Sequence, residues 1–115
     1  MFFGKEVRVQ LKRQAREAYL ELKKRDDKEA QTLLHSMHRM FDILKGNPQF
    51  GDPIRKQLIP RKFIDAGIQN LYRVELSNYW RMLYTHEGTK IEIFCFVLNI
   101  MDHKEYDKLF GYKKF

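Results

Sequence analysis

The sequence predicts an α+β fold in which an N-terminal helical hairpin packs on one face of a twisted, mainly antiparallel β-sheet. Two segments in the first half carry apolar residues at helical spacing, and three segments in the second half are rich in β-branched and aromatic residues. Such segregation of helices and strands is typical of the α+β class. At 115 residues the chain has the length of one domain, so we expect a single domain over residues 1–115.

Composition excludes several classes of protein. Hydrophobic residues make up 43% of the chain, which is enough to build a core and excludes global disorder. The longest apolar run, Ile93 to Leu98, is too short to span a membrane, and the residues after Met1 do not resemble a secretory signal. Cys95 is the single cysteine, so an internal disulfide is excluded. We therefore expect a cytoplasmic protein with no membrane contact.

The first 25 residues predict a strand followed by a helix. Val7, Val9 and Leu11 alternate with polar residues, as in a strand with one buried face, although the same residues could begin the following helix. The range Gln14 to Arg25 has apolar residues at helical spacing among good helix formers. This range is the first predicted helix.

A second helix is predicted to begin after Asp26 or Asp27, either of which is a suitable N-cap residue. An apolar stripe then continues until Gly46, Asn47 and Pro48 end the helix. The stripe consists of Ala30, Leu33, Leu34, Met37, Phe41 and Leu44. Because the connection between the two helices is short, we expect them to fold back on each other as an antiparallel hairpin.

The remaining chain predicts mostly strands. Ile54 to Ile59 predicts a short strand that Pro60 ends, and residues 61–70 are expected to form a loop. Three longer strands are predicted over Leu71 to Leu76, Trp80 to Thr85 and Lys90 to Asn99.

The loop between the first two of these strands decides which side chains share a face. A three-residue loop, Ser77 to Tyr79, pairs Leu76 with Trp80 and places Arg73 and Arg81 on one face of the sheet. A two-residue loop would put Arg81 among apolar side chains, where an unpaired charge is costly. We therefore expect the three-residue loop.

The next turn completes the expected sheet. A turn at Glu87-Gly88 pairs Tyr84 with Ile91 and places Ile91 on the apolar face, while Phe94 and Phe96 join the arginines on the other. The helical hairpin is expected to cover the apolar face, leaving the arginine face open.

Charge and side-chain chemistry favour an anionic partner. The formal net charge is +7, and such a basic surface attracts nucleic acid or an acidic protein segment. Arginine grips phosphate and phenylalanine stacks on unpaired bases, so Arg73 and Arg81, together with phenylalanines on the same face, suit single-stranded RNA. Alternatively, Glu75 and Arg81 form a cross-strand pair and the phenylalanines are core. The predicted RNA-binding residues are Arg55, Lys56, Phe94, Phe96 and Lys104.

Candidate acid–base residues occur near the C-terminus. His103 and Tyr106 are three residues apart, so in a helix they lie on one side and supply an imidazole and a phenol. His35 and His38 have similar spacing, but no carboxylate or third histidine shares their helix face, so we expect no metal site. No phosphate-binding glycine loop or nucleophile elbow is present, and we expect no cofactor.

Three motifs carry a family resemblance. They are Leu71-Tyr72-Arg73-Val74-Glu75-Leu76, Tyr79-Trp80-Arg81-Met82-Leu83-Tyr84, and Asp102-His103-Lys104-Glu105-Tyr106 with the following Phe110-Gly111-Tyr112. Together with the order of strand, helical hairpin and short basic strand before them, they resemble the RelE/ParE superfamily of toxins from prokaryotic toxin–antitoxin modules. The resemblance spans nearly the whole chain and implies a RelE-like fold.

The resemblance implies two activities. The RelE branch cleaves messenger RNA in the ribosomal decoding site without a metal, whereas the ParE branch inhibits DNA gyrase. Arg73, Arg81 and Tyr106 match catalytic positions of the family, and His103 lies near a further basic position. Glu75 falls where RelE-type nucleases carry a second lysine, which favours a gyrase inhibitor or an inactive binding protein as the alternative. The implied partners are a cognate acidic antitoxin and messenger RNA on the ribosome.

Overall fold

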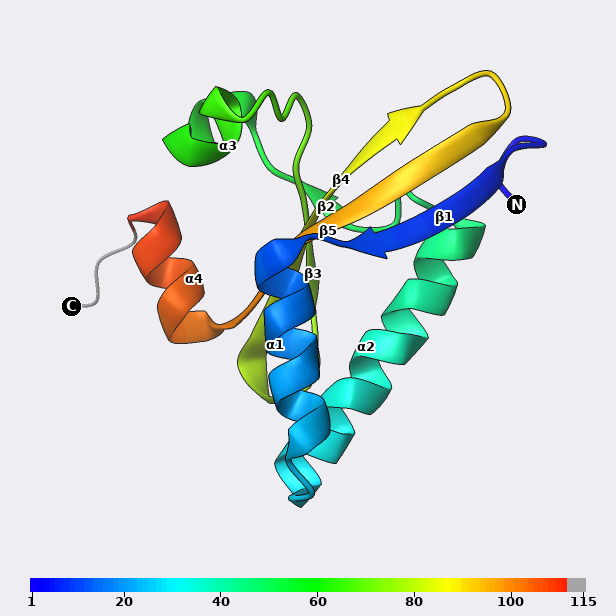
Figure 1. Ribbon diagram of the computed structural model, residues 1–115. Helices are drawn as coiled ribbons and strands as arrows, with labels where there is room; N and C mark the ends of the chain where they lie inside the picture. Colours follow the sequence, from blue (N-terminus) through cyan, green and yellow to red (C-terminus); the bar gives the residue numbers. More distant parts are fainter. Residues whose placement is uncertain (112–115) are drawn as a thin grey trace.

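The expected α+β class is confirmed by the computed structural model, which describes residues 1–111. Within these residues a five-stranded mixed sheet is combined with four α-helices (Figure 1). The strands are β1 (Glu6–Leu11), β2 (Asp52–Pro53), β3 (Tyr72–Glu75), β4 (Trp80–Gly88) and β5 (Glu92–Asp102). The helices are α1 (Arg13–Lys24), α2 (Lys28–Gly46), α3 (Arg61–Asp65) and α4 (His103–Phe110). None of these helices is long and apolar enough to cross a membrane.

The sheet has the order β1-β5-β4-β3-β2. The strand interpretation of Val7 to Leu11 is confirmed, and this strand comes before the helical hairpin. The sheet is mixed because β1 runs parallel to β5, whereas the other neighbouring strands are antiparallel. The hairpin of α1 and α2 thus connects β1 to the rest of the sheet.

The helical hairpin covers one face of the sheet, here called the hairpin face. The Asp27 carboxylate caps α2 by accepting a hydrogen bond from the backbone N–H of Ala30 at 3.2 Å. In Figure 1 both helices lie below the sheet and meet at their connection. Their apolar stripes pack against side chains of β1, β3, β4 and β5 to form the larger core. The buried helical residues of this core are Ala15, Leu22, Ala30, Leu33, Met37, Met40 and Leu44.

The predicted register between β3 and β4 is confirmed. The backbone N–H of Leu76 donates to the carbonyl of Trp80 at 2.8 Å, across a three-residue loop. Asn78 and Tyr79 take left-handed backbone conformations in this loop, with φ of 57° and 62°. Glu75 lies opposite Arg81. The face that carries Arg73 and Arg81 is called the arginine face below.

The predicted register between β4 and β5 is wrong. Tyr84 lies opposite Val97 rather than Ile91, and Ile91 is 74% exposed. The turn is longer than expected because the Thr89 hydroxyl oxygen accepts hydrogen bonds from the backbone N–H groups of Ile91 and Glu92, at 3.3 and 3.0 Å. A β-bulge between Leu83 and Tyr84 shifts the register once more. Phe94 and Phe96 still face away from the helical hairpin, as predicted.

The segment before β3 also differs from the prediction. The expected strand over Ile54 to Ile59 is replaced by a 3-10 turn, Lys56–Leu58, and the expected loop over residues 61–70 contains α3. Pro60 lies at the N-cap of α3, where its fixed φ and missing N–H suit the beginning of a helix. Phe63 of α3 is buried against the sheet.

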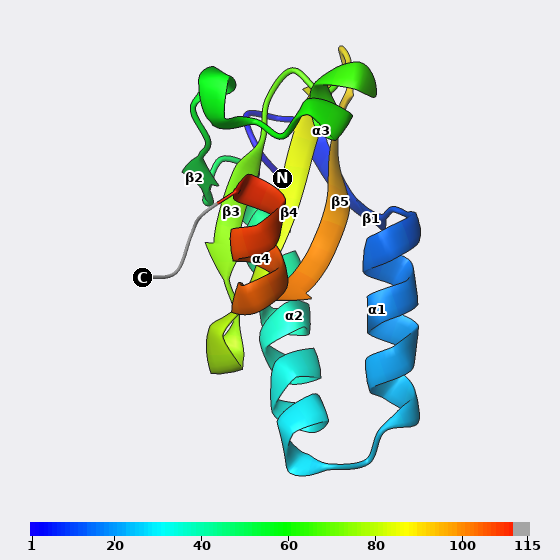
Figure 2. The ribbon, with the colours of Figure 1, turned by 90° about the vertical axis from the view of Figure 1, so that its left-hand side faces the viewer.

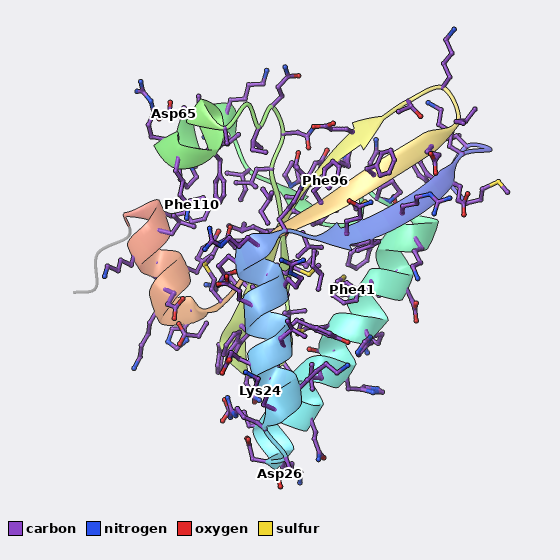
Figure 3. All side chains as sticks on the ribbon, viewed as in Figure 1. Lys24, Asp26, Phe41, Asp65, Phe96 and Phe110 are labelled. Atoms are coloured by element: carbon purple, nitrogen blue, oxygen red, sulfur yellow. The ribbon has the colours of Figure 1, made fainter. Side chains whose placement is uncertain are left out.

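The arginine face is therefore not open along its whole length. A second core lies beneath α3 and α4, which Figure 2 shows in front of the strands. Its buried members are Ile59, Phe63, Leu71, Leu83, Met101 and Tyr106. In Figure 3, Phe96 and Phe110 lie on this side of the sheet, whereas Phe41 belongs to the hairpin face.

Tyr84→Phe is expected to lower the free energy of unfolding by about 1–3 kcal/mol, measured by urea denaturation. The buried Tyr84 hydroxyl donates to the carbonyl of Pro48 at 2.7 Å and accepts from the N–H of Gly51 at 3.0 Å. The variant leaves both backbone groups without their partner. Tyr79→Phe, at a position that is 78% exposed, is the matched control and should leave stability unchanged. Equal stability of both variants would contradict this account.

Candidate functional site

Two strands and one helix bring Arg73, Arg81 and Tyr106 together on the arginine face. Arg73 lies on β3 and Arg81 on β4, two residue pairs apart along the ladder and therefore on the same face. Helix α4 crosses this face, with Asp102 as its N-cap and Gly111 as its left-handed C-cap. The side chain of Tyr106 points from α4 onto both arginines. We call these three residues the Arg–Tyr cluster.

Tyr106 is the centre of the cluster. Its hydroxyl oxygen accepts a hydrogen bond from Nη1 of Arg73 at 3.3 Å. The guanidinium carbon of Arg81 lies 4.6 Å from the centre of its ring, a cation–π distance. Tyr106 is 1% exposed, so its phenol does not reach solvent. Its contacts with the two arginines hold them in place.

Three carboxylates surround the two arginines. Arg73 Nη2 lies 3.6 Å from Oδ2 of Asp52, while Arg81 lies 3.9 Å from Glu75 and 4.0 Å from Asp107. The cross-strand pair of Glu75 and Arg81, which the sequence left as an alternative, is thus present, whereas the contributions of Asp52 and Asp107 were not foreseen. The distances to Arg81 exceed those of hydrogen bonds. Glu75 and Asp107 therefore balance the charge of its guanidinium without accepting hydrogen bonds from it.

Burial makes the cluster electrostatically unusual. The side chains of Arg73 and Arg81 are only 31% and 21% exposed, and the buried Nε atom of each has no hydrogen-bond partner within residues 1–111. The hydrogen bond with Tyr106 is the main cause that raises the pKa of Arg73 above its ordinary value, and the Asp52 carboxylate adds to it. Partly desolvated guanidinium groups bind an anion more strongly than fully solvated ones.

His103 is not part of the cluster. The predicted helix forms, and His103 is its first residue. Its ring contacts the ring of Tyr79 at 5.9 Å, and within residues 1–111 no hydrogen bond or ion pair joins it to Arg73 or Arg81. Three of the four predicted catalytic residues, Arg73, Arg81 and Tyr106, therefore lie together, and His103 does not.

The predicted RNA-binding phenylalanines form a separate surface. Phe94 and Phe96 stack with parallel rings 5.8 Å apart, and Nζ of Lys12 lies 4.4 Å from the centre of the Phe96 ring. Phe96 lies opposite Thr85, four residues along β4 from Arg81. At the rise of a strand this separates the two groups by roughly 13 Å. Both phenylalanines are half-buried, so their rings remain accessible for stacking.

The remaining predicted RNA-binding residues are exposed. Arg55 and Lys56 lie at the 3-10 turn before α3, and Lys104 lies in the first turn of α4. Tyr112, which belongs to the C-terminal motif, lies outside the described residues. Across residues 1–111 no three His, Cys, Asp or Glu side chains are placed to hold a metal ion. Metal-independent chemistry stays a prediction.

Comparisons of the chain with protein-family models, with curated proteins and with solved structures found no match. The interpretation of the site therefore depends on its geometry. Two partly buried guanidinium groups on one rigid sheet, with an exposed carboxylate beside one of them, are suited to hold a phosphate group and to accept a proton next to it.

Tyr106→Phe and Tyr106→Ala separate the role of the hydroxyl from that of the ring. The phenylalanine variant loses the hydrogen bond to Arg73 and should lower the free energy of unfolding by about 1 kcal/mol. The alanine variant also leaves a cavity in the second core and should cost about 3–5 kcal/mol. Urea denaturation measures both. If the alanine variant were no less stable than the phenylalanine variant, the ring would not be packed as described.

Proposed function

We propose that this protein is a RelE-like toxin of a toxin–antitoxin module, and that it cleaves messenger RNA on the ribosome without a metal ion. The observation that carries the proposal is the convergence of Arg73 and Arg81 on Tyr106. These are the three residues that match the family's catalytic positions, and they come from two strands and a helix. Their contact on one sheet face supports a shared role.

The RelE-like fold is proposed from the family resemblance that the three sequence motifs carry. A strand and a helical hairpin precede three consecutive antiparallel strands, and a short helix follows the last strand. This order matches the one that carries the family resemblance only in part, because the expected short basic strand over Ile54 to Ile59 does not form. On this proposal residues 1–115 form a single toxin domain.

The chemistry requires no redox partner or cofactor. The ribose 2′-oxygen attacks the adjacent phosphorus, the bond from phosphorus to the 5′-oxygen breaks, and the products carry a 2′,3′-cyclic phosphate and a 5′-hydroxyl. Arg73 and Arg81 stabilise the charge that develops on the non-bridging oxygens. Glu75, whose side chain is 69% exposed, is the candidate acceptor of the 2′-proton. His103 begins the same helix as Tyr106 and lies outside the cluster, and it is the candidate proton donor to the 5′-oxygen.

Tyr106 acts as a positioning residue in this scheme. Its buried phenol fixes the guanidinium of Arg73, and its ring lies against that of Arg81. Holding both cations in place before the phosphate arrives reduces the reorganisation needed during the reaction.

A protein that binds without cleaving is the second candidate function. Glu75 and Asp107 place negative charge beside Arg81, which opposes the binding of a phosphate group. In this case the same surface inhibits a protein target such as DNA gyrase, or the chain is an inactive RelE-fold binding protein.

We also propose a cytoplasmic location and a cognate acidic antitoxin as the partner. The charge of +7 attracts an acidic segment over a long range, and half-exposed apolar side chains such as Leu20 of the basic helix α1 offer apolar contact. Messenger RNA on the ribosome is the second partner of the proposed activity.

The cleavage proposal predicts cuts in the decoding-site codon of programmed ribosomes, with 2′,3′-cyclic phosphate ends. Arg81→Ala should slow the cut at least about a hundredfold because it removes a cation that faces the developing charge. Arg13→Ala is the matched control: Arg13 is an exposed residue of α1 that pairs with Glu17 and makes no contact with the cluster within residues 1–111. It loses the same charge and should cleave normally.

Two outcomes would contradict the cleavage proposal. Intact message at stoichiometric protein excludes the nuclease, and DNA damage with growth arrest would then select the gyrase inhibitor. Equal losses in the Arg81 and Arg13 variants would show that only net charge matters.

A further inference from the structure

A hollow lies on the flank of α4 opposite the Arg–Tyr cluster. Its lining residues come from the beginning of α1, from α3, from α4 and from β5. Its volume is about 600 Å³, within the range of small-molecule sites. We call it the Asn99 hollow. The residues that line it are Gln14, Lys62, Asn99, Met101, Glu105, Lys108 and Leu109.

The Asn99 side chain is a polar group at a position where the core pattern calls for an apolar one. It lies opposite Leu83 on β4 and two residues before Met101, and both neighbours are buried in the second core. Asn99 is only 7% exposed. Within residues 1–111 its amide has no hydrogen-bond partner, and its polar atoms are not among the fully buried ones, so they are accessible from the hollow. The amide therefore offers an unused donor and acceptor at the floor of the hollow.

Gln14 does not compete for this role. Its amide nitrogen donates to the carbonyl of Ile100 at 3.1 Å, and its amide oxygen accepts from the N–H of Ile100 at 2.9 Å. Both ends of this amide are committed to β5. Gln14 thus forms a fixed wall beside Asn99.

The rim of the hollow carries a net positive charge. Lys62 and Lys108 contribute two cations, and Glu105 contributes one carboxylate. The walls formed by Met101 and Leu109 are apolar. A ligand that satisfies all of these groups has a flat ring with an amide-like edge and a negatively charged group attached to it.

We propose that the Asn99 hollow binds one nucleotide of single-stranded RNA, with the base at the Asn99 amide and the phosphate at Lys62 and Lys108. A nucleobase has apolar faces and hydrogen-bonding edges, which fit the walls and the floor. A glutamate-rich peptide could reach the lysines with its carboxylates and the Asn99 amide with its backbone, but it offers no flat ring to the apolar walls. The choice of RNA as the natural ligand rests on the proposed function, since the hollow and the Arg–Tyr cluster flank the same helix.

The test is titration of the full chain with each of the four ribonucleoside 5′-monophosphates and with inorganic phosphate, followed by NMR of backbone amides. We expect at least one nucleotide to bind and to shift signals around Asn99. Asn99→Leu should weaken that nucleotide at least about tenfold, the effect of one lost buried hydrogen-bonding group. It should leave the weaker binding of inorganic phosphate unchanged. Lys108→Gln should weaken both ligands.

Two further measurements separate a binding role from a structural one. Asn99→Leu should fold with equal or greater stability, because an unpaired amide is replaced by an apolar side chain among Leu83 and Met101. Lys90→Gln, in the β4–β5 turn, removes the same charge as Lys108→Gln without touching the hollow, and should bind nucleotides like the wild type.

The proposal is overturned if no nucleotide binds at millimolar concentration, if Asn99→Leu binds as tightly as the wild type, or if a glutamate-rich peptide occupies the hollow instead. The readout is independent of cleavage. If the chain binds nucleotides through Asn99 but leaves message intact, the nuclease proposal fails and the nucleotide site stands. If the chain cleaves message but binds no nucleotide through Asn99, the nuclease proposal stands and the nucleotide site fails.

Discussion

The register of the β3–β4 hairpin is the constraint on which the site depends. The three-residue loop from Ser77 to Tyr79 places Glu75 opposite Arg81 and Arg73 opposite Leu83. Side chains alternate between faces, so a slip of β4 by one residue against β3 would move Arg81 into the larger core beneath the helical hairpin. That displacement would bury an unpaired charge, and its cost disfavours the shifted register.

Helix α4 turns this pair of arginines into a defined cluster. It covers the middle of the arginine face, inserts the Tyr106 ring beside both guanidinium groups and leaves their charges partly desolvated. The same helix carries Asp107, which compensates Arg81. The site thus combines strong cations with nearby carboxylates. On our proposal, an incoming phosphate group meets a preorganised but already partly neutralised surface, and the balance of these two effects decides between cleavage and simple binding.

Local signals in the sequence were sufficient for much of this fold. Asp27 as N-cap and the stripe from Ala30 to Leu44 specify α2, and the cost of burying Arg81 specifies the β3–β4 register. These signals involve residues close in the chain. They also place Arg73 and Arg81 on one face, which is the core of the candidate site.

The features that were missed depend on weaker or more distant signals. The turn after β4 is lengthened by the hydroxyl of Thr89, a side-chain effect that strand propensity does not contain. Helix α3 has only five residues, too few for a helical period to be recognised, and is held by the packing of Phe63. Asn99 could have been noticed as a polar residue at the end of an apolar strand. Its position in a hollow depends on α1, α3 and α4 together.

The central claim is that Arg73 and Arg81 grip the same phosphate group. A double-mutant cycle measures this most directly, using the affinity for ribosomes programmed with a decoding-site codon whose 2′-hydroxyls are methylated, so that binding occurs without cleavage. The account predicts that Arg73→Ala and Arg81→Ala each weaken binding and that the double variant loses clearly less than the sum of the two free-energy changes. Fully additive losses, or an Arg73→Ala variant that binds like the wild type, would contradict it.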